Sequence, residues 1–156
     1  MSIIRIVGAP ATGKSTIRSY LAGALSLPSL GIDDERLRYG WGNGAWEALA
    51  RKVQESEHCL LETSGVSPHD AAVCRGRKTF TILCTASRAA RKERLSRRLQ
   101  MGYALAQADP DYVTTLLAMS GPRLEPHITV NTSYGVDGRQ LQNITACCRV
   151  FLDEMG

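Results

Sequence analysis

The hydrophobic positions of the chain fall into short runs that alternate with longer amphipathic stretches. The short runs are rich in β-branched residues, and they predict five strands at residues 3–7, 27–32, 58–61, 79–84 and 127–130. The stretches between them carry apolar residues at helical spacing, which predicts helices at residues 15–25, 45–56, 88–101, within 102–120, and at 138–154. Strands that alternate with helices in this way indicate an α/β fold around a parallel sheet.

A glycine-containing segment joins the first strand to the first helix. Residues 8–16 read Gly-Ala-Pro-Ala-Thr-Gly-Lys-Ser-Thr and fit the pattern G-x-x-x-x-G-K-S/T at every fixed position. The alternative is a glycine-rich turn that matches by chance. The strand before the segment and the helix after it are the context that a phosphate-binding loop needs, so the sequence favours nucleotide binding.

Each residue type in this loop has a chemical reason. The glycines permit backbone conformations that a Cβ would forbid, so successive N–H groups can turn inward as an anion nest. Lys14 supplies positive charge to the β- and γ-phosphates of ATP, the Ser15 hydroxyl is placed to ligate Mg²⁺, and Thr16 can donate to the α-phosphate. The expected ATP-binding residues are Gly8, Ala11, Thr12, Gly13, Lys14, Ser15 and Thr16.

An acidic group, Asp33-Asp34-Glu35-Arg36, follows the second predicted strand. Ligands of open α/β sheets bind at the carboxyl ends of the strands, so these side chains are in the right place for chemistry. One aspartate can accept a proton from an attacking hydroxyl. Asp34 and Arg36 are expected to bind the acceptor, and Arg36 can hold an anionic part of it. The alternative is that Asp33 or Asp34 caps a helix, and both roles can hold at once.

Two further segments could contribute to the same edge. Residues 39–46 hold three glycines and three aromatic rings, and Trp41 and Trp46 could stack on a flat acceptor such as a nucleobase or could fill the core. Glu62 directly follows the third predicted strand. An acidic residue at this position usually contacts Mg²⁺ together with the loop serine. His69 is expected to be a surface or capping residue.

The predicted helix at residues 88–101 is strongly basic. Arg94 and Arg98 are four residues apart and share a face, with Arg91 close to it. Such a row could close over the triphosphate and neutralise charge on the transferred group, or it could be an exposed basic face.

The composition limits the class of protein. The 156 residues are 44% hydrophobic and 22% charged, which is ordinary for one globular domain. Apolar runs stay well short of the ~20 residues of a membrane span, and the first strand leaves no room for a signal peptide. The five cysteines form no C-x-x-C pair, so we expect a reduced, cytoplasmic protein without a membrane partner. The net charge of +4 suits an anionic substrate but does not establish nucleic-acid binding.

These motifs together resemble those of the small P-loop kinases, most closely the branch of the polynucleotide 5′-hydroxyl kinases. The segment 33–36 matches the family's Asp-Asp-x-Arg group, and Glu62-Thr63 is similar to its acid-Thr pair with Glu in place of the usual Asp. Arg94 and Arg98 match its two lid arginines. The resemblance implies that Asp33 is the base and that Arg36 grips acceptor phosphate.

The resemblance also implies an architecture and an activity. It predicts a three-layer P-loop kinase fold with a five-stranded parallel sheet, one domain over residues 1–156 and a helical, arginine-bearing lid at about residues 87–125. The expected activity is transfer of the γ-phosphate of ATP, with Mg²⁺, to a hydroxyl of a nucleic acid or nucleotide. A kinase of a small metabolite or antibiotic is the alternative, and a non-transferring ATPase switch is a second one. The sequence does not choose the acceptor or the oligomeric state.

Overall fold

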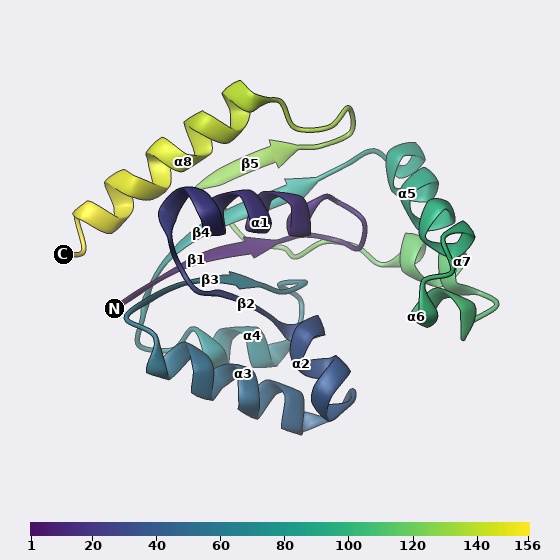
Figure 1. Ribbon diagram of the computed structural model, residues 1–156, viewed down its shortest axis with the longest axis horizontal. Coiled ribbons are helices and arrows are strands. Elements are labelled where there is room, and N and C mark those ends of the chain that lie inside the picture. The colour runs from purple at the N-terminus through teal and green to yellow at the C-terminus, as the bar shows by residue number, and fades with distance from the viewer.

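A five-stranded parallel sheet forms the middle layer of the protein (Figure 1). The computed structural model describes residues 1–156, apart from the side chains of residues 104 and 105. The strand order is β2-β3-β1-β4-β5, and all neighbouring strands are parallel. The strands are β1 (Ser2–Val7), β2 (Ser29–Gly31), β3 (His58–Glu62), β4 (Lys78–Thr85) and β5 (Ile128–Asn131). The α/β fold with a five-stranded parallel sheet is therefore confirmed.

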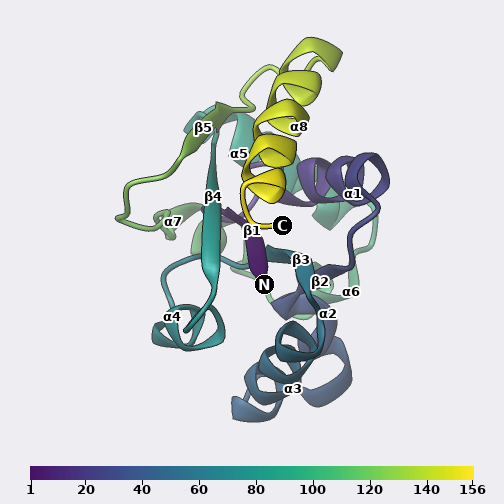
Figure 2. The ribbon, with the colours of Figure 1, turned by 90° about the vertical axis from the view of Figure 1, so that its left-hand side faces the viewer.

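Helices cover both faces of the sheet and complete three layers (Figure 2). On one face lie α1 (Lys14–Leu25) and α8 (Gly138–Asp153), and on the other lie α3 (Asn43–Glu55) and α4 (Pro68–Val73). The short helix α2 (Ile32–Tyr39) follows β2 directly. Asp137 is the N-cap of α8, and its carboxylate accepts from the Gln140 backbone N–H in a capping box.

The alternation of side chains along each strand divides the core between the two faces. Ile4 and Ile6 of β1 pack with Ile17 of α1 and with α8, whereas Ile3 packs with Leu49 of α3. All four of these isoleucines and Leu49 are fully buried. The two apolar layers fix the sheet between its helices and so hold the carboxyl ends of the strands at one edge.

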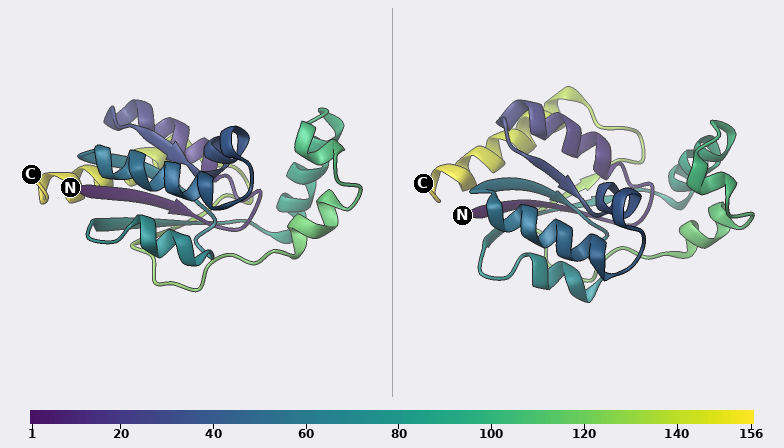
Figure 3. Two further views of the ribbon diagram at one scale, coloured as in Figure 1. Left: turned by 90° about the horizontal axis from the view of Figure 1, so that it is seen from below. Right: turned by 60° about the horizontal axis from the view of Figure 1, so that its bottom comes forward.

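Three further helices stand together beyond that edge (Figure 3). They are α5 (Arg88–Gln100), α6 (Ala104–Gln107) and α7 (Tyr112–Ala118), called here the α5–α7 group. The group has an apolar cluster of its own, which includes Leu95, Tyr112 and Leu117 and also takes in Ala11 of the glycine loop. The α5–α7 group is thus joined to the loop by packing as well as by chain connection.

The structure differs from the predicted elements in three places. The second strand is shorter than expected, and α2 begins at Ile32, so the acidic group lies inside a helix. The glycine-rich segment is also shorter, because α3 already begins at Asn43. Residues 102–120 contain two short helices in place of one. No helix of the described residues is both long enough and apolar enough to cross a membrane.

Candidate active site

The glycine loop has the strained backbone that phosphate binding requires. Gly8 has a φ of +154° and Gly13 a φ of +82°, and the non-glycine residue Ala11 also lies in the left-handed region at +62°. A Cβ on Gly8 would lie 2.4 Å from the carbonyl oxygen of Cys84, so no other residue fits there. Gly13 is the N-cap of α1, which places the positive end of that helix at the loop. The loop therefore has the positive-φ backbone that the glycines were expected to permit, next to a helix N-terminus.

Lys14 directs its charge into the concave side of this loop. Its Nζ atom donates to the carbonyl oxygens of Gly8 and Ala9, each at 3.0 Å. An ammonium group has three protons, so one remains for a phosphate oxygen. Burial lowers the pKa of Lys14, while the negative charges of Glu62 and Asp33 oppose that shift and the Arg98 guanidinium adds to it.

Ser15 and Glu62 come together as the sequence predicted for a metal site. The Ser15 hydroxyl donates to Glu62 Oε1 at 3.1 Å, at the carboxyl end of β3. Hydroxyl and carboxylate oxygens are the donors that Mg²⁺ prefers, so this pair fits the ion that accompanies ATP. The second carboxylate oxygen of Glu62 lies 3.0 Å from Nε of Arg18, a residue of α1 that sequence reasoning did not single out.

The two aspartates of α2 have different partners. Asp33 is 79% exposed and pairs with Arg36 at 3.0 Å, whereas Asp34 pairs with Arg18 at 3.1 Å. The alternative role as a helix cap is wrong for both, because the N-cap of α2 is Gly31 and it has no side-chain hydrogen bond. Asp33 is thus the more accessible carboxylate, and it is also the one whose charge acts on Lys14.

The two tryptophans have different surroundings in the structure. Trp46 belongs to α3, is 7% exposed and packs into the core. Its ring stacks on that of His69, with the two centroids 5.3 Å apart. His69 is exposed, as expected of a surface residue. Trp41 is 69% exposed, and the Arg36 guanidinium lies over its ring at 4.5 Å. Of the two rings, only that of Trp41 is open to a ligand.

The arginines of α5 also divide into two kinds. Arg91 Nε donates to the Pro10 carbonyl at 2.9 Å, and Arg94 Nη1 donates to the Ala11 carbonyl at 3.0 Å. These two side chains therefore hold the outside of the glycine loop. Arg98 has no hydrogen-bond or ion-pair partner among the described side chains, and its charge acts on Lys14. Arg98 is thus the arginine of this row that is available to a phosphate.

Thr132 is a contact residue of the loop that sequence reasoning missed. It is 1% exposed, follows β5 directly, and its hydroxyl donates to the Thr12 carbonyl at 2.7 Å. The same hydroxyl accepts from Arg94, which also donates to the Thr132 carbonyl. The segment after β5 thus joins the loop and α5, and the only signal for it in the sequence is its place after a strand.

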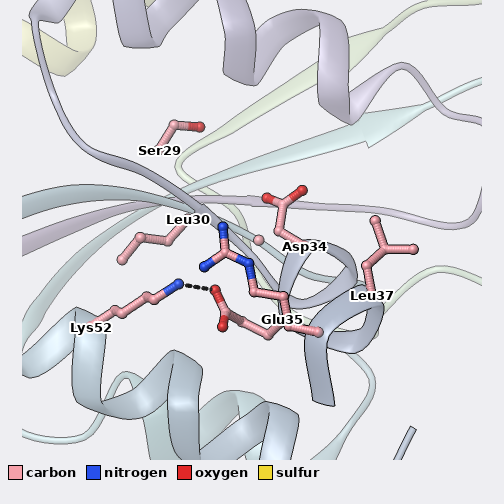
Figure 4. A pocket seen from close by; sticks show the side chains of 8 residues that line it. Ser29, Leu30, Asp34, Glu35, Leu37 and Lys52 are labelled. Atoms are coloured by element: carbon pink, nitrogen blue, oxygen red, sulfur yellow. Dashed lines mark hydrogen bonds and ion pairs between the residues drawn. The ribbon is translucent and has the colours of Figure 1, made fainter. Parts of the chain in front are cut away.

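Two hollows lie at the carboxyl edge of the sheet. One of about 260 Å³ runs beside the glycine loop and is lined by Ala9, Thr12, Cys84, Thr85, Arg91 and Pro122, among others. The other, of about 280 Å³, lies at the outer edge of β2 between α2 and α3 (Figure 4). There Lys52 reaches across to the buried carboxylate of Glu35 at 2.5 Å, with Asp34 and Leu37 on the far side.

Comparison with solved structures places the fold among small kinases. A protein of Chloroflexus aurantiacus described as a candidate kinase has a TM-score of 0.73 at 21% identity, over 98% of this chain and 96% of that one. The Mycobacterium tuberculosis APS kinase CysC, in complex with AMPPNP and APS, has a TM-score of 0.67 at 16% identity, over 95% and 97%. A gluconokinase of Sinorhizobium meliloti has a TM-score of 0.61 at 17% identity, over 99% and 97%.

These likenesses show the fold, which is that of the small P-loop kinases. No protein-family model matches the sequence, and no curated protein matches it either. The predicted resemblance to P-loop kinases is confirmed at the level of the fold. The narrower resemblance to polynucleotide 5′-hydroxyl kinases is not confirmed, because the similar structures named here include an APS kinase and a gluconokinase.

Proposed function

We propose that the protein is an ATP- and Mg²⁺-dependent phosphotransferase whose acceptor is a hydroxyl group of a small molecule. The observation that carries this proposal is the geometry at the glycine loop, where Lys14 Nζ is held by the carbonyl oxygens of Gly8 and Ala9 and the Ser15 hydroxyl donates to Glu62 Oε1 at 3.1 Å. A phosphate-binding lysine, an exposed carboxylate, a metal-binding pair and a free arginine are the groups that phosphoryl transfer needs.

Each group has a role in the proposed reaction. Lys14 and the loop N–H groups bind the phosphates. Ser15 with Glu62 would hold Mg²⁺, which would supply positive charge to neutralise the phosphates. Asp33 accepts the proton of the attacking hydroxyl, because it is the exposed carboxylate of the pair. Arg98 balances charge on the transferred phosphoryl group, and the α5–α7 group acts as the lid.

A small acceptor is favoured over a nucleic acid for two reasons. The similar structures include kinases named for small molecules, APS and gluconate. In addition, the acceptor side carries paired charges, Asp33 with Arg36 and Asp34 with Arg18, whereas a nucleic-acid backbone is held by unpaired cations. Arg36 and the open ring of Trp41 suit an acceptor with a flat or anionic part.

Transfer of the labelled γ-phosphate of ATP tests this proposal. The panel contains sugar acids, nucleosides and other small hydroxyl compounds, oligonucleotides with a free 5′-hydroxyl, and a reaction without acceptor. We expect label on a small molecule and none with Lys14→Ala. Label on oligonucleotides alone would move the assignment to the polynucleotide kinases. Hydrolysis that no acceptor stimulates would support the ATPase switch.

A further inference from the structure

Arg18 lies at the centre of an ionic bridge that links three elements of the candidate site. It is on α1, one helical turn after Ser15, and its side chain is 18% exposed. Its Nε lies 3.0 Å from Glu62 Oε2, and its Nη1 lies 3.1 Å from Asp34 Oδ2. A planar guanidinium fixes the direction of the oxygens it contacts, which an ammonium group does not. One side chain therefore contacts two carboxylates, that of Asp34 on α2 through a hydrogen bond and that of Glu62 on β3 through an ion pair.

The Arg18 guanidinium occupies the space that a side chain at Gly31 would take. Gly31 ends β2, and a Cβ built on it would lie 2.1 Å from Arg18 Nη1 and 3.1 Å from Asp34 Oδ2. The φ of Gly31 is −147°, an extended value that any residue adopts, so its conformation does not require glycine. The requirement is steric: the missing side chain at Gly31 makes room for the guanidinium.

The two carboxylate oxygens of Glu62 have different partners. Oε1 accepts from the Ser15 hydroxyl, and Oε2 faces Arg18, so the carboxylate cannot rotate without losing one of the two contacts. Asp34 is held at the other end of the same guanidinium. Asp33, the residue before Asp34 in α2, lies outside the bridge and pairs with Arg36.

We propose that Arg18 is a positioning residue, which acts together with the space at Gly31. It holds Glu62 and Asp34 as the oxygen environment of Mg²⁺ beside Ser15, and it keeps Asp34 out of proton transfer. The proposal rests on the proposed function for the presence of the metal, but it concerns binding of the metal–nucleotide complex and needs no acceptor. Partners that orient metal ligands typically contribute about 10- to 100-fold to metal affinity.

Calorimetric titration with ADP, with and without Mg²⁺, tests the bridge in the whole chain. The measured quantity is the ADP affinity with Mg²⁺ divided by the ADP affinity without it. This ratio reports how much the bound metal adds to nucleotide binding. For Arg18→Met and Gly31→Ala we expect this ratio to fall by about 10-fold or more, with metal-free ADP affinity close to that of the wild type. Arg18→Lys, which keeps the charge but reaches one carboxylate at a time, should fall in between.

Gly23→Ala is the matched control, since it adds the same methyl group to α1 where nothing lies within 4 Å. Melting temperatures show which variants remain folded, and if Gly31→Ala does not fold, the two Arg18 variants decide. An unchanged ratio in folded Arg18→Met would overturn the proposal. An equal loss of metal-free and metal-bound affinity would also overturn it, because the residue would then only support the loop.

The two proposals fail in different ways. If the wild type binds ADP equally well with and without Mg²⁺, there is no metal site for Arg18 to arrange, and the positioning role is overturned. If the ratio responds as expected but no acceptor takes label, the bridge stands and the proposed transferase function fails.

Discussion

Arg94 on α5 donates a hydrogen bond of 3.0 Å to the carbonyl oxygen of Ala11, the one non-glycine residue of the glycine loop with a left-handed backbone. Left-handed conformations cost free energy in residues with a Cβ and persist where the surroundings impose them. Arg94 also binds the segment after β5 through Thr132. The arginine that the sequence suggested for phosphate is therefore engaged in holding the loop in shape.

The two arginines should give different defects. Arg94→Ala removes charged hydrogen bonds to the Ala11 carbonyl of the loop and to Thr132, each worth about 1.5–3 kcal/mol, so we expect weaker ATP binding and a lower melting temperature. Arg98→Ala should lower the transfer rate more than it weakens ATP binding, because its charge matters most at the moving phosphoryl group. Arg97→Ala on the same helix is the control, since its exposed pair with Glu93 contributes little. Equal effects of the first two changes on rate and binding would contradict the division.

The two aspartates can be separated by conservative changes. Asp33→Asn should keep ATP binding and reduce transfer by roughly 10² to 10⁴-fold, which is the usual contribution of a general base. Asp34→Asn should act mainly on the metal dependence, because Asp34 belongs to the Arg18 bridge. Single-turnover rates and ADP titrations distinguish them. A severe rate defect in Asp34→Asn beside a mild one in Asp33→Asn would reverse the assignment.

Replacement of the two tryptophans should have different effects: loss of Trp41 should weaken acceptor binding, and loss of Trp46 should lower the stability of the fold. Trp41→Ala should raise the acceptor KM, by an amount equivalent to about 1–3 kcal/mol if a ring of the acceptor stacks on it. Trp46→Ala should instead reduce the free energy of unfolding by about 3–5 kcal/mol, because it empties a core site. Melting curves and acceptor KM values on the same two variants test both. A normal acceptor KM in Trp41→Ala would rule out stacking.

Nucleotide binding should depend on the charge of Lys14. Its pKa is lowered from 10.5, mainly by burial, and only the protonated form attracts phosphate. We expect ATP affinity to fall as the pH rises through this lowered pKa, at a lower pH than an ordinary lysine would give. Bound phosphate stabilises the ammonium form, so binding should take up protons in that range. Lys14→Met should bind weakly and lose this dependence, which titrations in buffers of different ionisation enthalpy would show.

The sequence was most informative where function depends on local backbone shape. The glycine loop could be placed because its two glycines and its lysine stand at fixed spacing between a strand and a helix. The acidic group could be placed because parallel strands bring their carboxyl ends to one edge. Ser15 and Glu62 met as expected for the same reason.

The remaining contacts depend on packing between distant segments. Thr132 binds the loop across 120 positions of the chain, and nothing about a threonine after a strand indicates that partner. The pairing of Arg18 with Asp34 depends on the start of α2 and on the space at Gly31. The tryptophans read alike in the sequence, and the start of α3 at Asn43 decides which one faces the core.

The apolar cluster of the α5–α7 group has a practical consequence for protein engineering. Ala11 supplies part of that cluster from the glycine loop, and Arg91 and Arg94 satisfy their donors on the loop carbonyls. A graft of these helices onto another scaffold would expose the cluster and remove the loop carbonyls that accept from Arg91 Nε and Arg94 Nη1. The transferable unit is therefore the three helices together with residues 8–13 and with Thr132, which Arg94 also binds, although residues 8–13 lie 74 or more positions before the helices in the chain.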